Sequence, residues 1–159
     1  MQKNKLFLSV QYADTRLQEI LPRPLLRKWI KAALLAPAKI TLRFVDAKEG
    51  QELNRNYRGK DYATNVLTFA YNEPDSNNEF NDFLYDFTQA DIILCTDVLQ
   101  REAAEQKKTL ESHAAHLVIH GVLHAQGYDH ESDEEAEEME TLEIEFLAAL
   151  GFPNPYIEA

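Results

Sequence analysis

The segment from about Leu110 to Gln126 constrains the fold of this chain more strongly than any other. It is predicted to be a helix, and its residues are nearly continuously apolar from Leu117 onward, which is typical of a helix buried in a protein core. The same segment carries His120 and His124. Because a buried imidazole needs partners for its polar nitrogens, the sequence predicts a polar or metal-binding site inside the core.

Three histidines at 120–130 have the spacing of a metal site in the sequence HGVLHAQGYDH. His120 and His124 lie four residues apart, so they project from one face of the helix. Gly127 can adopt a positive φ, which would end the helix and turn His130 back towards the other two. Three neutral imidazoles suit zinc and leave a fourth position for water or substrate. We therefore expect one zinc ion per chain, although nickel and copper also bind imidazole.

The same spacing occurs in metzincin proteases, but one essential residue differs. Those enzymes carry a Glu directly after the first His, where it acts as the general base, whereas this chain has Gly121. A metal-dependent peptidase would need a base from elsewhere, such as the acids Asp75, Glu79 or Asp82. Gly121 costs about 1 kcal/mol in a helix interior, which indicates that space is needed beside the metal.

The charged residues are distributed unevenly along the chain. The net charge of −11 argues, taken alone, against a nucleic-acid partner. However, the ten Lys and Arg residues in 23–60 face only three acids, whereas residues 61–100 contain eight acids and no Lys or Arg. A local basic surface is what phosphate contacts need. The alternative is that these cations are scattered over solvated helix faces.

The remaining segments alternate between predicted strands and helices, which indicates one small α/β or α+β domain over residues 1–159. The predicted strands are Leu6–Tyr12, Lys39–Val45, Asn65–Tyr71 and Ala90–Cys95. Besides the core helix, helices are predicted after Pro22, after Asp46, over Val98–Gln106 with Asp97 and Gln100 as a capping pair, and after Ser132 with Glu135 as a capping box.

The last predicted helix has an apolar stripe and many acids. Its inward residues are predicted to be Ala136, Met139, Leu142, Phe146 and Leu150. The nine acids from 131 to 145 are interpreted as its solvated face.

Three further predictions concern His113, Cys95 and the location of the protein in the cell. His113 is predicted to lie at the surface. The single Cys95 allows no intrachain disulfide and is expected to pack in a strand. The sequence has no stretch typical of a signal peptide or a membrane span, so a cytoplasmic location is expected.

The segment HLVIHGVLHAQGYDH at 116–130 resembles the signature of the YbeY family, bacterial metal-dependent endoribonucleases that act in ribosomal RNA maturation. The resemblance continues through LNRNYRGKDYATNVLTF, ADIILC, DEEAEEME and the closing GFPNPY. It implies an α/β (α+β-like) fold with a central mixed sheet of about four strands, about five helices and the metal site on a core helix. Ala90 and Thr68 depart mildly from the family's usual Gly and Ser.

The resemblance implies a zinc-dependent endoribonuclease that cuts single-stranded RNA. It also implies roles in ribosomal RNA maturation, including the 3′ end of 16S RNA, and in ribosome quality control. The implied partners are ribosomal RNA and the small ribosomal subunit, with ribosomal proteins and a ribosome-associated GTPase as further partners; the acidity of the chain fits docking on basic ribosomal proteins. The alternative to an enzyme is a non-catalytic ribosome-assembly factor with structural zinc.

The resemblance also assigns roles to residues. It places the metal ligands at His120, His124 and His130, and the functional arginine of the family at Arg58. A guanidinium there offers a fixed cation and a planar fork for a phosphate oxygen.

Other residues are open to more than one interpretation. Arg55 and Lys60 are weaker candidates for contacts with backbone phosphates. His116 lies four residues before His120 and is either an orienting donor or acid at the site, or a histidine that is satisfied structurally. The attacking group is either a metal-activated water or the 2′-hydroxyl of the RNA, and the sequence leaves both open.

Overall fold

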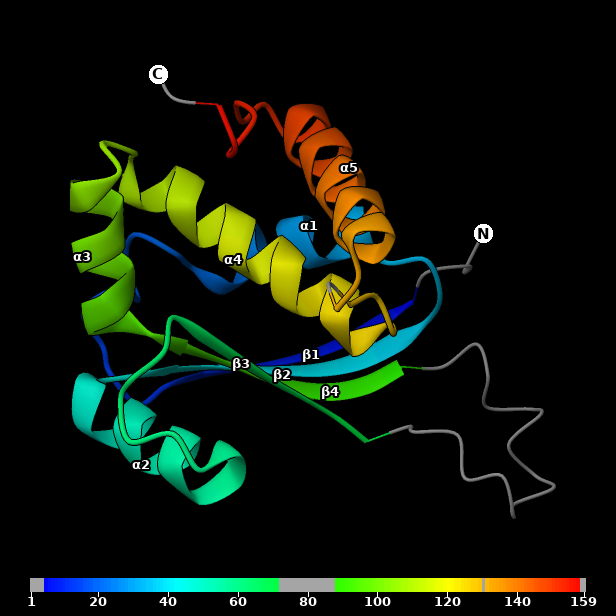
Figure 1. The fold of residues 1–159 in the computed structure, drawn as a ribbon. Coiled ribbons are helices and arrows are strands. Elements are labelled where there is room, and N and C mark those ends of the chain that lie inside the picture. Colours follow the sequence, from blue (N-terminus) through cyan, green and yellow to red (C-terminus); the bar gives the residue numbers. More distant parts are fainter. Residues whose placement is uncertain (1–4, 72–87, 130, 158–159) are drawn as a thin grey trace, which may run out of the picture.

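The computed structural model describes residues 5–71, 88–129 and 131–157. Its elements follow the predicted alternation of strands and helices (Figure 1). They are β1 (Leu6–Tyr12), α1 (Arg23–Ala33), β2 (Ala38–Val45), α2 (Ala47–Arg58), β3 (Val66–Ala70), β4 (Thr88–Cys95), α3 (Thr96–Glu105), α4 (Leu110–Ala125) and α5 (Asp133–Ala149). The predicted fold class is confirmed: the described residues form a mixed four-stranded sheet with five helices.

The strands lie in the order β1-β2-β4-β3. The first three are parallel to one another, and β3 is the antiparallel strand at one edge. This topology gives the sheet two differently covered faces. Helices α1, α4 and α5 lie over one face, and α2 lies on the other (Figure 1).

Each face of the sheet has its own apolar core. The larger one contains Trp29 of α1, Ile92 of β4 and most of the apolar side chains of α4. The smaller one lies under α2 and contains Leu67 and Ile93. The predicted core helix is confirmed, since ten of the sixteen residues of α4 are buried.

Gly121 brings α4 close to the sheet. A Cβ atom at this position would lie 3.0 Å from Ile92 Cγ2 and 3.3 Å from Thr68 Oγ1. Real Cβ atoms rarely come so close to their neighbours, and both neighbours belong to the sheet. The space that glycine provides therefore serves helix–sheet packing, whereas the predicted need for space beside a metal stays a prediction.

The start of α3 differs from the prediction. The helix begins at Thr96 with Cys95 as its N-cap and no side-chain capping bond, so the predicted pair of Asp97 and Gln100 does not cap it. Asp97 is used elsewhere: its carboxylate accepts hydrogen bonds from the backbone N–H of Ala47 and from Arg16. Cys95 itself is buried at the end of β4, as expected.

Two polar residues that were assigned to solvent are buried. His113 is 3 % exposed, and its Nε2 lies 2.9 Å from Glu102 Oε1 of α3. Burial lowers the pKa of His113, although Glu102 acts in the opposite direction. Glu143 of α5 is 1 % exposed, so the interpretation of all nine acids as a solvated face is wrong for this residue. The Ser132 cap of α5 is confirmed, because its side chain accepts from Glu135 N.

Candidate metal centre

The first two predicted ligands lie side by side on α4. The rings of His120 and His124 have centroids 4.5 Å apart and are nearly perpendicular, at 83°. Both side chains are half-buried. Helical spacing places them on the same face one turn apart, so the predicted pairing of these two histidines is present in the structure.

The turn after α4 has the predicted glycine-based geometry. Gly127 has a φ of +102°, its N–H donates to His124 O, and Tyr128 N donates to Leu123 O. These two bonds form a Schellman motif, which satisfies carbonyls at the helix end and reverses the chain. Gln126 fixes this end of α4 to α1, since its amide donates to Ala33 O. The third predicted ligand, His130, lies outside the described residues.

A buried carboxylate from α5 contacts the histidine row. Glu143 Oε2 lies 3.1 Å from Nδ1 of His120, and Oε1 lies 2.6 Å from Nε2 of His116. The hydroxyl of Tyr156, beyond the end of α5, donates to the same Oε1 over 2.6 Å. Burial would raise the pKa of Glu143, but the hydrogen bonds from these three side chains outweigh it and lower the pKa to about 2.

The charge of Glu143 determines where the hydrogens of its partners lie. An ionised carboxylate can only accept hydrogen bonds, so Nδ1 of His120 and Nε2 of His116 carry the hydrogens in these contacts. In a neutral His120 ring with its hydrogen on Nδ1 the lone pair lies on Nε2, which is the form that a metal ligand requires. Burial and the neighbouring carboxylate raise the pKa of Tyr156, so its hydroxyl remains protonated.

The described donors at this centre are two imidazoles, with a carboxylate beside one of them. Among the residues that the structure describes, no cluster of three or more His, Cys, Asp or Glu side chains has the arrangement of a metal site. The described pair of imidazoles with a carboxylate on the far nitrogen of one ring nevertheless fits zinc chemistry, because metal-bound histidines usually donate their other N–H to such a group. The third donor is the predicted His130.

Arg58 is positioned by the end of α2. Gly59 ends this helix in the left-handed conformation at φ +70°, and its N–H donates to Arg55 O. The following turn is held by the buried Asn54, whose amide donates to Tyr62 O. Arg58 is therefore an exposed cation on a fixed turn.

Arg55 and Lys60, the weaker candidates for phosphate contacts, are close to Arg58 in the sequence. Lys60 is exposed, and Arg55 is exposed and lies 3.9 Å from Asp61 Oδ1.

The histidines and Arg58 lie on opposite faces of the sheet, at the edge formed by β3. Thr68 of β3 contacts the position of Gly121, which follows His120. The next residue, Phe69, points to the opposite face, where its ring lies 5.0 Å from that of Tyr57. Since Tyr57 directly precedes Arg58 in the sequence, the end of α2 that carries Arg58 lies near β3 on the face opposite α4.

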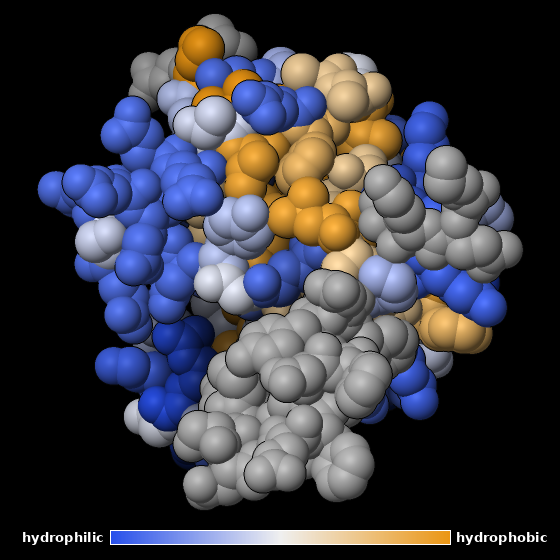
Figure 2. Space-filling model, turned by 90° about the vertical axis from the view of Figure 1, so that its right-hand side faces the viewer, coloured by the Kyte–Doolittle hydropathy of each residue, from blue (hydrophilic) through white to orange (hydrophobic). Residues whose placement is uncertain are grey.

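A hollow lies beside the turn between α4 and α5. Its lining includes Asp129, Glu131, Glu135 and Glu138. Figure 2, which views the molecule from this end, shows hydrophilic residues gathered over one side of the face, with hydrophobic residues beside them. The four carboxylates make this hollow unfavourable for a phosphate backbone.

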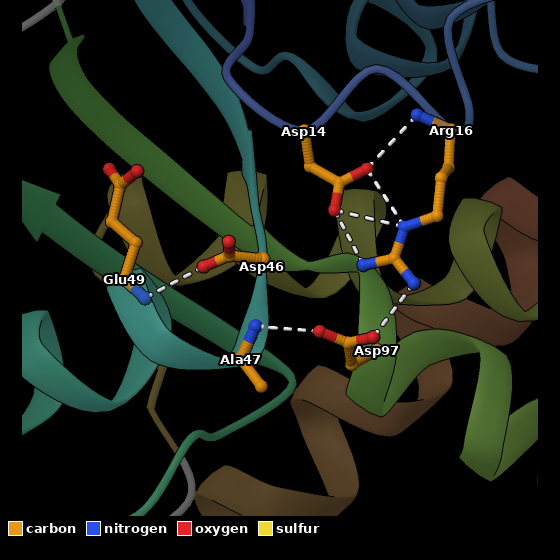
Figure 3. A network of polar contacts seen from close by, with 6 residues as sticks. All are labelled: Asp14, Arg16, Asp46, Ala47, Glu49 and Asp97. Atoms are coloured by element: carbon orange, nitrogen blue, oxygen red, sulfur yellow. Dashed lines mark hydrogen bonds and ion pairs between the residues drawn. The ribbon is translucent and has the colours of Figure 1, made fainter.

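A second polar network lies at the carboxyl ends of the parallel strands (Figure 3). Arg16 donates to Asp14, with Nε 3.0 Å from both carboxylate oxygens, and to Asp97 over 2.8 Å. Asp46 caps α2 by accepting from Glu49 N. Such strand ends often bind ligands, but the acceptors here are already bonded within the protein. This network is therefore a weaker candidate site than the histidine cluster.

Comparison with known proteins gives the family. The family model described as Endoribonuclease YbeY matches residues 5–151. The chain belongs to the endoribonuclease YbeY family. A YbeY relative from Herminiimonas arsenicoxydans is 83 % identical over the full length of both chains. Another, from Janthinobacterium sp. (strain Marseille), is 75 % identical and covers 99 % of this chain and 98 % of that protein.

A solved structure is consistent with this YbeY assignment. The solution structure of TM1509 from Thermotoga maritima is similar to this chain with a TM-score of 0.53 and 27 % sequence identity. The match covers 92 % of this chain and 91 % of that one. In the described part of the chain, no helix is long and apolar enough to cross a membrane.

Two residues of this network, Glu143 and Tyr156, were not predicted from the sequence. Glu143 was grouped with the surface acids of α5, yet it lies four residues from both Met139 and Leu147, which are buried on the same helix. A carboxylate in phase with an apolar stripe is a signal of a buried, partnered charge.

Proposed function

We propose that this chain is a zinc-dependent endoribonuclease that cuts single-stranded RNA during ribosomal RNA maturation. Membership of the endoribonuclease YbeY family shows a nuclease that acts on RNA. The single structural observation that carries the zinc dependence is the pairing of His120 with His124, together with the Glu143 carboxylate on the Nδ1 of His120.

The metal would be held by His120, His124 and the predicted His130. When bound, zinc polarises a phosphoryl oxygen or lowers the pKa of a water molecule to about 7. The residues of the chain supply the remaining functions. Glu143 contacts Nδ1 of His120, so in the neutral ring the hydrogen lies on Nδ1 and the lone pair on Nε2, the nitrogen that would bind the metal. His116 shares the same carboxylate, so the structure favours an orienting role over that of a proton donor to the substrate.

Arg58 would stabilise the charge that develops on the phosphate. A guanidinium is a planar cation that can contact two oxygens at once. An RNA strand that reaches both Arg58 and the histidines would pass over the edge strand β3, because Thr68 and Phe69 face the two parts of the site. Arg55 and Lys60, on the same turn as Arg58, would contact neighbouring phosphates.

A peptidase is disfavoured by two observations. The position that bears the general base in metzincins is Gly121, which packs against the sheet and has no room for a larger side chain. The buried carboxylate closest to the histidines is Glu143, whose low pKa and three donors make it a poor base. The acids Asp75, Glu79 and Asp82 lie outside the described residues.

The proposal includes a cellular setting. We place the enzyme in the cytoplasm, where the small ribosomal subunit is its site of action and the 3′ end of 16S RNA is a substrate. Ribosomal proteins and a ribosome-associated GTPase would be protein partners, and quality control of ribosomes a second role. The one cysteine, buried Cys95, is compatible with a reducing compartment.

The test is cleavage of labelled ribosomal RNA by purified protein whose metal content is measured. Arg58→Ala is expected to keep the fold and the metal but to reduce turnover by about 100-fold, as for loss of a group that stabilises transition-state charge. His124→Ala is expected to lose the metal and the activity together. Arg101→Ala is the matched control, because Arg101 is an exposed arginine on α3 that pairs with Glu105 on the same helix.

Two outcomes would contradict the proposal. If Arg58→Ala cleaved RNA at the wild-type rate, the proposed contact between Arg58 and the phosphate would be wrong. A His124→Ala variant with its full metal content would remove the ligand assignment, and cleavage of peptides but not RNA by the wild type would favour the peptidase.

A further inference from the structure

Glu143 is an unusual residue in this protein because it is charged and almost fully buried. Its side chain is 1 % exposed, and it lies between α4 and α5. A buried carboxylate is costly unless hydrogen bonds compensate for the lost water. Here both carboxylate oxygens are used, Oε2 by His120 and Oε1 by His116 and Tyr156.

The three donors come from different parts of the fold. His116 and His120 lie one turn apart on α4, whereas Tyr156 lies in the segment after α5. That segment is fixed to the rest of the protein: Lys108 Nζ donates to Pro155 O over 2.8 Å, and the ring of Phe152 packs edge-on against Trp29. The hydroxyl of Tyr156 is therefore held at Glu143 from outside the histidine helix.

We propose that Glu143 is the positioning residue of the metal centre, and that Tyr156 and His116 hold its carboxylate in place. Glu143 acts through His120: it fixes which ring nitrogen carries the hydrogen and restricts rotation of the ring. The C-terminal segment is thereby coupled to metal binding. This inference rests on the proposed function, because it takes His120 to be a ligand.

The geometry argues against a purely structural role for the carboxylate. A purely structural carboxylate needs hydrogen-bond donors for its two oxygens, and any donors would serve. Glu143, however, contacts Nδ1 of His120, the ring nitrogen that lies across the ring from Nε2. Groups that accept a hydrogen bond from a metal-bound histidine raise its basicity and its order, and their loss typically weakens metal affinity about 10- to 100-fold.

The experiment measures zinc affinity of the full-length protein by competition with a chromophoric chelator. Glu143→Gln keeps the size of the side chain but removes the charge, and it is expected to weaken zinc binding about 10- to 100-fold. Tyr156→Phe removes a single hydroxyl and is expected to weaken binding about 2- to 10-fold, the loss of one hydrogen bond. The visible spectrum of the Co²⁺-substituted protein reports the ligand geometry and should change in both variants.

Tyr71→Phe is a matched control for Tyr156→Phe. Tyr71 also donates its hydroxyl to a carboxylate, Asp91 Oδ2, but this pair is exposed and lies away from the histidines. The control is expected to bind zinc with the affinity of the wild type. The melting temperature of each metal-free protein is measured in parallel, since a structural role would lower stability without changing the zinc affinity of the folded protein.

The outcomes separate this inference from the proposed function. Wild-type zinc affinity and Co²⁺ spectra in the folded variants would overturn the positioning role alone. If Glu143→Gln fails to fold, Tyr156→Phe decides by the same criteria. If the wild type itself binds no zinc, the proposed function fails and the positioning role fails with it.

Discussion

Two polar networks of this protein use the same chemical groups in different surroundings. At one site, Glu143 is buried between α4 and α5 and accepts from two histidines and a tyrosine. At the other, Asp14 and Asp97 accept from Arg16 at the carboxyl ends of the strands, where the side chains of Arg16 and Asp97 are 44 % and 38 % exposed and that of Asp14 is 8 % exposed. The exposure of Arg16 and Asp97 is what distinguishes this network from the buried one.

The difference has an energetic and a functional consequence. Water can replace the partners of an exposed carboxylate, so each contact there contributes little to stability and can be lost individually. A buried carboxylate has no such replacement, so its partners must be present together and their positions are tightly defined. The buried network is therefore suited to hold a metal ligand, and the exposed network to connect loops.

The largest expected effect is that of Glu143→Ala. This change leaves His116, His120 and Tyr156 without their common acceptor, and it should lower the free energy of unfolding of the metal-free protein by about 3–5 kcal/mol. Urea unfolding measures it. A loss below about 1 kcal/mol would mean that water reaches this network, and the contrast between the two regions would disappear.

A smaller effect is expected for Asp97→Ala. Asp97 connects the start of α2 to the loop after β1, because it accepts from Ala47 N and from Arg16. The loss of these partly exposed bonds should cost about 1 kcal/mol in the same urea experiment. A cost as large as that of Glu143→Ala would show that exposure does not separate the two networks.

The smallest effect is expected for Arg16→Met, which removes the cation but keeps an extended side chain. The cost should be about 0.2–1 kcal/mol and should decrease in 1 M salt, because exposed ion pairs are screened. Equal costs at low and high salt, measured by urea unfolding, would contradict a surface electrostatic origin.

The cost of Arg16→Met should also depend on pH. Hydrogen bonds from Arg16 lower the pKa of both Asp14 and Asp97 below 3.8, although burial acts in the opposite direction. A carboxylate with a lowered pKa in the folded state stabilises above its unfolded pKa and loses this contribution as the pH falls through the folded pKa. The difference between wild type and variant should be complete above about pH 5 and shrink below about pH 4. If the stability difference between wild type and Arg16→Met grew as the pH falls, the lowered pKa values of Asp14 and Asp97 would be contradicted.

Local patterns in the sequence were sufficient to predict α4 and its ends. Apolar continuity predicted a core helix, histidine spacing predicted the adjacent rings of His120 and His124, and Gly127 predicted the reversal after the helix. These features depend on residues within a few positions of one another, so neighbouring sequence contains the necessary information.

Features that depend on distant partners were not predictable in this way. Asp97 has the residue type of a helix cap, but Arg16, 81 residues away, and Ala47 N compete for its carboxylate. Glu143 was hidden among the acids of α5, because its donors His116 and Tyr156 become neighbours only in the folded chain.

The central claim is that this chain cleaves RNA with a metal held by the histidines of α4 and the following turn. The most direct measurement is the rate at which the purified wild type cuts a labelled single-stranded ribosomal RNA segment, before and after chelation and after zinc is restored. The account predicts that cleavage stops when the metal is removed and returns with about one zinc ion per chain. Cleavage at the full rate by protein shown to be free of metal would contradict it.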